Sequence, residues 1–450
     1  MKKRKVYELD IESTEFPGFG VAYKENKKVL IKGALPGQKV TAFVRKFKSG
    51  NAMANLNDIL EDVDYKIEPE CPVFEICGGC SHQFISYEKQ LEFKEDQLLK
   101  LFEKAEISGF EFLGVDGSPE VFEYRNKMEF SFGDMEKGGE LCLGMHMKGR
   151  SFSIVTADQC KIVDGDFRLV LKTVLDYFRS KDLKHYRIMA REGYLRNLLI
   201  RKGKNTGDLM IGIVTTSQVD FDMSEITEIL KSLDYKGELK SLLHIVNDSL
   251  SDTVQADEVR VLYGEDYITE EILGLKFKIS PFSFFQTNSL GAEKLYSIVR
   301  DFMGDADNKT VFDLYCGTGT IGQIVAQNAK KVVGVELIEE AVEAAKENAK
   351  LNGLNNCEFI AGDVKNVIQN LKENPDIIIL DPPRPGVHPV ALDYVLKFDA
   401  KEIIYVSCNP KTLVNDLKVL LEGDYKIECV KGMDLFPMTP HLESIVRLTK

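Results

Sequence analysis

The chain has 450 residues, of which 44% are hydrophobic and 29% are charged, and its formal net charge is −13. This composition is that of a globular protein with several domains, and the sequence contains no run of about 18 uncharged apolar residues that would cross a membrane. The acidic net charge does not exclude a nucleic-acid partner, because a local basic face can bind phosphate on an acidic protein.

The N-terminal residues indicate a small β domain. The basic start Met1–Lys5 is not followed by an apolar stretch, which argues against a signal peptide, so we expect a cytoplasmic protein. Short strand-like runs then alternate with Gly and Pro turns such as Phe16–Gly20 and Ala34–Gly37, which predicts a compact barrel. Arg45–Lys48 places a phenylalanine among cations, as proteins that bind single-stranded nucleic acid do, although a lysine-protected strand edge shows the same pattern.

A glycine-rich loop with closely spaced cysteines follows and predicts a metal site. Cys71, Cys77 and Cys80 lie within ten positions, and Cys160 lies far downstream. The odd total of nine cysteines favours reduced thiols over a disulfide framework. Four thiolates suit tetrahedral zinc or an iron–sulfur cluster. Because zinc sites usually show two paired motifs, the three-plus-one arrangement favours a 4Fe-4S cluster over zinc. The alternative is that these cysteines are unrelated buried thiols that bind no metal.

The next part of the chain combines a helix with a mixed β region. Residues 86–106 carry apolar side chains at helical spacing, which predicts an amphipathic helix. Farther on, Tyr124–Phe130 and Leu195–Lys202 place arginines and lysines on predicted strands. Such strands could line an RNA surface, but ordinary half-exposed strands have the same composition.

From about Leu273 the pattern changes to alternating strands and helices. Val311–Thr320 reads as a strand, a glycine turn and the start of a helix, and Val332–Glu336 reads as a second strand that ends in an acid. This is the arrangement of a nucleotide-binding fold, in which the acid takes a ribose hydroxyl. The turn is DxxxGxG rather than GxGxxG, so it favours S-adenosyl-L-methionine (SAM) over NAD.

Three further strands each end in a polar residue. Glu358–Asp363 and Ile377–Asp381 deliver carboxylates, and Ile403–Cys408 delivers a thiol before an Asn-Pro step. Open α/β sheets build their binding sites at the carboxyl ends of their strands. A lone cysteine is more often a buried small hydrophobe, but this setting indicates that Cys408 is catalytic.

Five ordered motifs make a resemblance specific. The chain resembles the RNA 5-methyluridine methyltransferase family, close to its ribosomal-RNA branch, over nearly its whole length. The motifs are Phe284–Asn288, Asp313–Gly319, Asp381–Arg384, Ser407–Pro410 and Asp434–Glu443.

The resemblance implies three domains: an N-terminal TRAM domain with an OB-like β-barrel (residues 1–62), a central α+β RNA-binding domain with an iron–sulfur loop (63–272), and a C-terminal α/β Rossmann-like SAM-dependent methyltransferase domain (273–450). It places Tyr124–Lys127 in the RNA-binding domain and packs the helix near 86–106 on the C-terminal domain. It also makes the four cysteines Cys71, Cys77, Cys80 and Cys160 the ligands of a 4Fe-4S cluster.

The resemblance also suggests a mechanism. Because C5 of uracil is a poor nucleophile, the thiolate of Cys408 would first add to C6, and the resulting enolate carbon would attack the methyl group of SAM. Glu443, at the family's base position, would then remove the C5 proton so that the cysteine can leave. The target uridine must be flipped out of its stack or lie in a loop.

Strand-end position and resemblance together assign the cofactor contacts. Glu336 would bind the ribose hydroxyls, Tyr315 the adenosine and Asp363 the adenine edge. Gln286 and Asp381 would lie at the methionine end and the reaction centre.

The substrate and two rival functions complete the expectations. A TRAM domain together with four cysteines points to 23S ribosomal RNA, because the transfer-RNA branch generally lacks both; a tRNA uridine-C5 methyltransferase is the alternative. An exocyclic-amine methyltransferase would carry an aromatic residue where Arg384 stands. A non-catalytic RNA-binding ribosome assembly factor is the alternative of another class, and the presence of Cys408 and Glu443 argues against it. We expect a monomer with no membrane partner.

Overall fold

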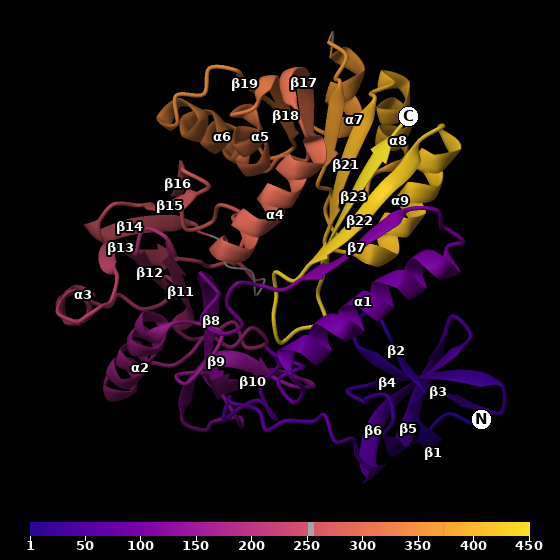
Figure 1. Cartoon of the computed structure of the whole chain (residues 1–450). Helices are drawn as coiled ribbons and strands as arrows, with labels where there is room; N and C mark the ends of the chain where they lie inside the picture. Colours follow the sequence, from indigo (N-terminus) through magenta and orange to yellow (C-terminus); the bar gives the residue numbers. More distant parts are fainter. Residues whose placement is uncertain (251–255, 372) are drawn as a thin grey trace.

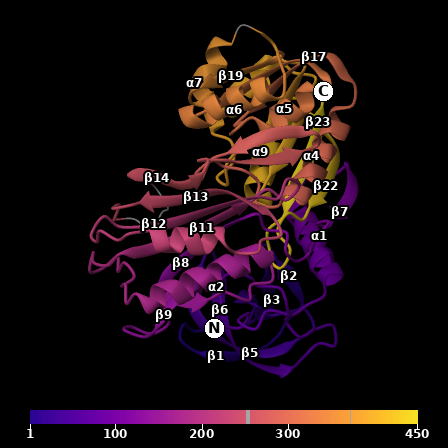
Figure 2. The same cartoon turned by 90° about the vertical axis from the view of Figure 1, so that its left-hand side faces the viewer.

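The computed structural model describes residues 1–250, 256–371 and 373–450. Figures 1 and 2 show a small β-barrel at one end of the molecule, a large mixed sheet flanked by helices at the other, and a second large sheet beside them. None of the helices in these described ranges is long and apolar enough to cross a membrane.

The N-terminal barrel is a sheet of six strands in the order β1-β5-β6-β4-β3-β2. In β5, Val40, Ala42 and Val44 are fully buried while the residues between them are more exposed, the alternation expected of a strand with one face on a core. The strands are β1 (Val6–Asp10), β2 (Ser13–Glu15), β3 (Phe19–Lys24), β4 (Lys27–Lys32), β5 (Lys39–Lys48) and β6 (Asn51–Glu61).

The central sheet has seven strands in the order β10-β9-β8-β11-β12-β13-β14. Two helices bury their apolar side chains on one face of it, and the other face packs against the C-terminal part. The strands are β8 (Lys127–Asp134), β9 (Leu141–Met147), β10 (Arg150–Thr156), β11 (Leu195–Lys202), β12 (Asp208–Thr215), β13 (Glu238–Val246) and β14 (Glu258–Gly264), and the helices are α2 (Gly165–Ser180) and α3 (Ser224–Lys231).

The C-terminal sheet has eight strands in the order β19-β18-β17-β20-β21-β23-β22-β7. The first five are parallel, and β23 runs antiparallel to β21. The strands are β19 (Cys357–Ala361), β18 (Ala329–Glu336), β17 (Ala306–Leu314), β20 (Ile377–Leu380), β21 (Glu402–Ser407), β23 (Glu443–Thr449), β22 (Lys426–Met433) and β7 (Glu111–Asp116).

Helices cover both faces of this sheet, which explains why its parallel strands are continuous apolar runs. All four residues of β20 are fully buried. Helices α4 (Ser289–Met303) and α5 (Thr320–Ala326) pack on one face, and the other face carries α1 (Tyr87–Lys104), α7 (Val364–Val367), α8 (Pro389–Phe398) and α9 (Pro410–Glu422). Helix α6 (Glu339–Leu351) packs beside β19 at the edge.

The sequence order of the domains is interleaved in space. Helix α1 contacts α9, and β7 pairs in parallel with β22, so both elements belong to the C-terminal unit although they precede the central sheet (Figure 1). The range 63–272 predicted for the central domain therefore contains a piece of the C-terminal fold. The boundary predicted at residue 273 falls in the turn between β15 (Ile268–Ile272) and β16 (Leu275–Ile279), which form one hairpin.

Candidate active site

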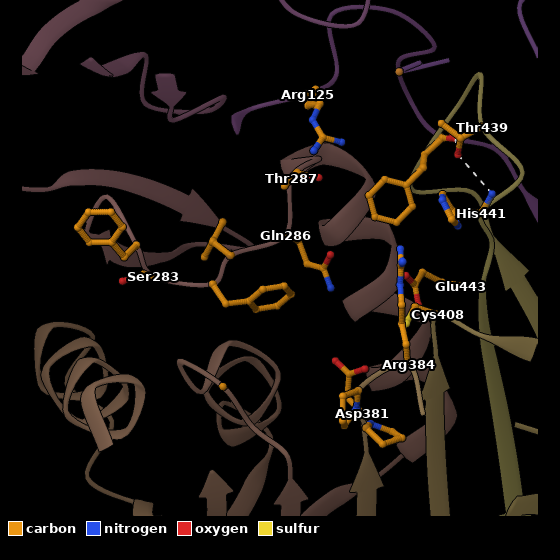
Figure 3. A pocket seen from close by; sticks show the side chains of 18 of the residues that line it. Arg125, Ser283, Gln286, Thr287, Asp381, Arg384, Cys408, Thr439, His441 and Glu443 are labelled. Atoms are coloured by element: carbon orange, nitrogen blue, oxygen red, sulfur yellow. Dashed lines mark hydrogen bonds between the residues drawn. The ribbon is translucent and has the colours of Figure 1, made fainter. Parts of the chain in front are cut away.

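A groove of about 3060 Å³ runs from the N-terminal barrel to the carboxyl edge of the C-terminal sheet. Phe19 and Arg45 of the barrel, Arg125 of the central part and Cys408 all line it. Figure 3 shows its inner end, where Gln286, Asp381, Arg384, Cys408 and Glu443 converge. The walls of this groove thus come from all three parts of the chain.

The parallel strands deliver the predicted polar residues to this groove. Tyr315 follows β17, Glu336 ends β18, Asp363 lies two residues after β19, Asp381 follows β20 and Cys408 follows β21, and all of them line the groove. Because the carboxyl ends of parallel strands meet at one edge, residues far apart in the sequence become neighbours. The structure therefore brings together the residues that the sequence predicted for cofactor and catalysis.

Cys408 lies in a tight connection between strand and helix. Asn409 caps α9 by accepting the N–H of Lys411 at 3.3 Å, and Pro410 occupies the first turn. The thiol is half-buried, and burial raises its pKa to about 11, with further raising by the charges of Glu443 and Asp381. Arg384 acts in the opposite direction and lowers the pKa of this thiol by a hydrogen bond and by its charge.

The antiparallel strand β23 places Glu443 beside the strand that leads to Cys408. Glu443 is the first residue of β23, whose next residue Ser444 pairs with Ser407 of β21. Its side chain is 4% exposed, and burial, assisted by the charge of Asp381, raises the pKa of Glu443 to about 8 despite the neighbouring Arg384. The thiol of Cys408 and the carboxyl of Glu443 therefore line one groove from adjacent strands.

Arg384 is a residue of this site that the sequence prediction omitted. Its side chain lies beside Cys408 and Glu443 in Figure 3. Its backbone carbonyl accepts hydrogen bonds from Asn409 Nδ2 at 2.9 Å and from Thr412 Oγ1 at 3.2 Å, which ties its loop to the start of α9. The signal was present in the Asp381–Arg384 motif, where a cation follows two prolines beside the thiol strand.

The glycine turn after β17 has a geometry suited to a nucleoside. Tyr315, Gly317 and Gly319 have φ of 68°, 54° and 71°, and a Cβ on Gly319 would lie 2.6 Å from the ring of Phe359. Only glycine fits there without displacing that ring. Glu336 accepts the N–H of Gly317 at 3.0 Å, so the turn and the acid of the next strand form one unit.

Asp363 and Gln286 complete the predicted cofactor set. Asp363 caps α7 and forms a 2.9 Å ion pair with Lys365, whose hydrogen bond lowers the pKa of the carboxyl. Gln286 lies between β16 and α4, where its backbone carbonyl accepts Asn126 Nδ2 at 2.9 Å. The central part of the chain therefore holds one wall of the groove in place.

The segment Tyr124–Lys127 differs from the predicted RNA surface in its orientation. Tyr124 is 1% exposed and Asn126 9% exposed, and both contact the C-terminal part. Arg125 is the member of this segment that lines the groove. Two of its four side chains thus serve the contact between domains.

The four predicted cluster cysteines lie near one another on two loops. Burial raises the pKa of Cys80 to about 12 and that of Cys160 to about 11, and the other thiols of the set raise both further. Within the described ranges, however, no group of three or more His, Cys, Asp or Glu side chains has a metal-ligating arrangement. Four thiols in two neighbouring loops are nevertheless the donor chemistry of a thiolate-bound group.

The C-terminal part has the fold of a SAM-dependent methyltransferase, with its polar residues at the carboxyl edge of a doubly wound sheet. A model of the tRNA (uracil-5-)-methyltransferase family matches residues 86–450, and a TRAM domain model matches residues 1–56. The chain therefore belongs to the tRNA (uracil-5-)-methyltransferase family and carries a TRAM domain at residues 1–56, which confirms the predicted family and the predicted TRAM domain.

Named relatives are similar over their whole length. A Clostridium tetani protein named uncharacterized RNA methyltransferase is 65% identical over 450 residues, which is 100% of this chain and 99% of that protein. A relative with the same description from Caldanaerobacter subterraneus subsp. tengcongensis is 48% identical over 100% of both chains. The crystal structure of Pyrococcus abyssi tRNA (uracil-54, C5)-methyltransferase with S-adenosyl-L-homocysteine matches with a TM-score of 0.78 and 26% identity, covering 98% of this chain and 100% of that one.

Proposed function

We propose that this protein transfers a methyl group from SAM to C5 of a uridine in RNA through a covalent adduct with Cys408. The observation that carries the proposal is the meeting of Cys408, Arg384 and Glu443 in one groove, from adjacent strands and the loop beside them. A thiol, a cation that favours the thiolate and a buried carboxyl are the groups that addition to C6 and removal of the C5 proton require.

The protonation states suggest an order of events. Burial raises the pKa of Cys408 to about 11 and that of Glu443 to about 8, so both groups hold their protons at pH 7 before RNA binds. A neutral Glu443 does not oppose the formation of the thiolate, and Arg384 favours it. Glu443 must first release its own proton to solvent and can then take the C5 proton. The electrons of the C5–H bond re-form the C5–C6 double bond, Cys408 leaves as the thiolate, and 5-methyluridine is released.

SAM is the cofactor that the strand-end residues suit. Tyr315 and the Gly317 turn would hold the adenosine, Glu336 the ribose and Asp363 the adenine edge, while Gln286 and Asp381 would border the reacting methyl group. The structure of the Pyrococcus abyssi relative with S-adenosyl-L-homocysteine supports SAM as the cofactor.

The cysteine set is the proposed site of a 4Fe-4S cluster, with Cys71, Cys77, Cys80 and Cys160 as ligands. Two observations support this proposal. The thiols lie close enough for the charges of some to raise the pKa values of Cys80 and Cys160, and thiolates are the usual ligands of such a cluster. When bound, a cluster would join the two loops covalently and supply structural support. The methyl transfer uses no electron from it.

For the substrate we propose 23S ribosomal RNA, with transfer RNA as the second candidate. The four cysteines and the TRAM domain favour ribosomal RNA. The Pyrococcus abyssi relative, which is named for position 54 of tRNA and spans nearly this whole chain, favours transfer RNA.

Mapping 5-methyluridine in both RNAs tests the function and the substrate together. Nuclease digests of ribosomal and transfer RNA would be analysed by mass spectrometry, from cells with the gene, without it, and with the Cys408→Ala form. Loss from 23S ribosomal RNA that only the natural protein restores is the expected result. Loss from transfer RNA alone would identify transfer RNA as the substrate in place of ribosomal RNA. No loss from either RNA would contradict the proposed reaction.

A further inference from the structure

The segment 434–442 connects β22 to Glu443. Residues from other parts of the chain hold this segment in place. Its first residue, Asp434, is fully buried and forms a 2.7 Å ion pair with Lys94 of α1. Both side chains are at most 2% exposed. The segment then lines the groove with Phe436, Thr439 and His441. Figure 3 shows Thr439 and His441 near Glu443.

Met438, in the middle of this segment, has an unfavourable backbone conformation. Its φ is 66°, in the left-handed region that residues with a side chain rarely adopt. Such a conformation persists only where the surroundings fix it, and it occurs preferentially at functional sites. The contacts that fix it are therefore informative.

Those contacts come from α1 and from the cysteine loop, which is the segment of residues 71–82 that carries Cys71, Cys77 and Cys80. The N–H of Met438 donates to Gln90 Oε1 at 3.0 Å, and its carbonyl accepts the N–H groups of Ser81 and His82 at 2.9 and 3.1 Å. Gln90 also donates to the carbonyl of His82 at 3.1 Å. The two residues that directly follow Cys80 thus hold the segment that leads to the base.

The central part and the barrel reach the same segment. Tyr124 donates its hydroxyl to the carbonyl of Pro437 at 3.1 Å. A Cβ on Gly18 of the barrel would lie 3.0 Å from His82 Nε2 and 3.2 Å from Pro440 Cβ, so this loop packs tightly on both. All three parts of the molecule meet where the chain turns toward Glu443.

Several of these contacts serve no substrate directly. Within the described chain, Gln90, Lys94 and Tyr124 are absent from the lining of the groove. An ion pair buried in this way often stabilises a protein no more than apolar packing of the same volume would, and its better-attested use is to select one arrangement over others. An arrangement that matters here is the distance between Glu443 and the C5 proton of the adduct.

We propose that Lys94, Gln90 and Tyr124, with the backbone of Ser81–His82, form a clamp that positions Glu443 for proton removal. The inference rests on the proposed function, because Glu443 is the base only in that reaction. The clamp acts on the second half of the reaction, the release of the adduct, and leaves the addition of Cys408 unchanged. It also makes the cysteine loop a positioning element for the base, although the loop lies far from Glu443 in the sequence.

Two RNAs separate the two halves of the reaction. RNA transcribed with 5-fluorouridine allows addition of the thiol and methyl transfer, but fluorine at C5 cannot be removed as a proton, so the covalent adduct persists. The rate at which this adduct forms reports addition and methyl transfer without release. Turnover of the same RNA with ordinary uridine reports addition, methyl transfer and release together. The RNA is the ribosomal or transfer RNA fragment that the mapping identifies.

The test compares Lys94→Met with Lys100→Met, because Lys100 also lies on α1 but pairs on the surface with Asp96. For Lys94→Met we expect turnover to fall about 100-fold, the cost of a small misplacement of a reacting group. Formation of the fluorinated adduct should stay near the natural rate, and adduct with ordinary RNA should accumulate on denaturing gels. Lys100→Met should behave as the natural protein in all three assays.

A milder pair of variants protects the test against misfolding. Tyr124→Phe removes one hydroxyl that donates to Pro437, and Tyr235→Phe removes a hydroxyl that donates to the carbonyl of Leu230 away from the groove. Tyr124→Phe should slow release severalfold and leave addition unchanged, while Tyr235→Phe should change neither. Thermal unfolding and binding of S-adenosyl-L-homocysteine report whether each variant is folded.

The outcomes are distinct. If addition and release slow equally in the folded variants, these contacts only support the fold in general, and the clamp is wrong. Unchanged turnover in Lys94→Met and Tyr124→Phe would also overturn the clamp. If the natural protein forms no adduct with 5-fluorouridine RNA, the proposed function itself fails, and the clamp fails with it.

Discussion

The nucleophile and the base of the proposed site are positioned in different ways. Cys408 lies between the end of β21 and the capped start of α9, so a few consecutive residues determine where its thiol points. Glu443 comes after a segment of the chain that α1, the cysteine loop and Tyr124 hold from outside. The difference indicates that local structure places the nucleophile, whereas contacts between domains place the base.

The largest expected effect is loss of the thiol. Cys408→Ala should lower turnover at least about 10⁴-fold, because it removes the group that adds to C6 in the proposed reaction. Binding of S-adenosyl-L-homocysteine, measured by calorimetry, should stay near the natural value, since the cofactor residues lie on other strands. Residual methylation within tenfold of the natural rate would contradict covalent catalysis by Cys408.

Glu443→Gln should block the step that follows methyl transfer, the removal of the C5 proton. Without a base, we expect release to slow about 10²- to 10⁴-fold, so that methylated RNA stays bound to Cys408 and migrates with the protein on a denaturing gel. Normal release of 5-methyluridine by this variant would remove Glu443 from its assigned role.

The same variant should become more stable than the natural protein as the pH rises. Burial raises the pKa of Glu443 from 4.5 to about 8, so between these values the folded protein binds a proton that the unfolded chain releases. Stability is then lost as the pH rises toward 8, because the folded state must either keep a proton or bury a charge. Glu443→Gln should therefore unfold at a higher temperature than the natural protein at pH 8, and the difference should shrink toward pH 5.

The pH dependence of release sharpens the comparison of nucleophile and base. Since Glu443 acts as a base only when it is deprotonated, the single-turnover rate of adduct release should increase through a pKa near 8. About a fivefold increase is expected from pH 7 to pH 8, because the deprotonated fraction of Glu443 rises from roughly a tenth to about a half over that interval. A release rate independent of pH between 6 and 9 would show that another group limits the step.

Sequence patterns predicted the local half of the site better than the half that depends on tertiary contacts. The strand ends at Tyr315, Glu336, Asp381 and Cys408 could be read from apolar runs and turn residues, because each is fixed by its own strand. The pairing of β23 beside β21 is antiparallel and brings Glu443 from the far end of the chain, so periodicity alone could not place it. Resemblance to a family supplied it instead.

The interleaving of domains was equally inaccessible to residue patterns. Nothing in the composition of Glu111–Asp116 distinguishes an edge strand of the C-terminal sheet from a strand of the central one. The ion pair of Lys94 with Asp434 joins residues that are 340 positions apart, and each alone reads as an ordinary surface charge. Arg384 was visible in its motif, but its action on the thiol required the folded loop.

Arg384→Met tests the electrostatic part of the nucleophile's position. Removing the cation that favours the thiolate should raise the pKa of Cys408 and slow adduct formation at pH 7 by about tenfold, which corresponds to one pKa unit. Arg384→Lys, which keeps the charge, should recover part of the loss. Adduct formation with 5-fluorouridine RNA, followed from pH 7 to pH 10, measures both variants, and an unchanged pH profile would exclude this role.

The smallest effect is expected for the cap that follows the thiol. Asn409→Ala removes the oxygen that accepts the N–H of Lys411 and the amide that donates to the carbonyl of Arg384. Loss of such a cap costs about 1 kcal/mol of stability, and we expect adduct formation to slow severalfold while release stays unchanged. This pattern is the reverse of that expected for Lys94→Met, because Asn409 acts on the nucleophile through the local chain and Lys94 acts on the base from another domain. If both variants slowed the same step, the nucleophile and the base would be positioned as one unit, and the distinction between local and interdomain positioning would be wrong.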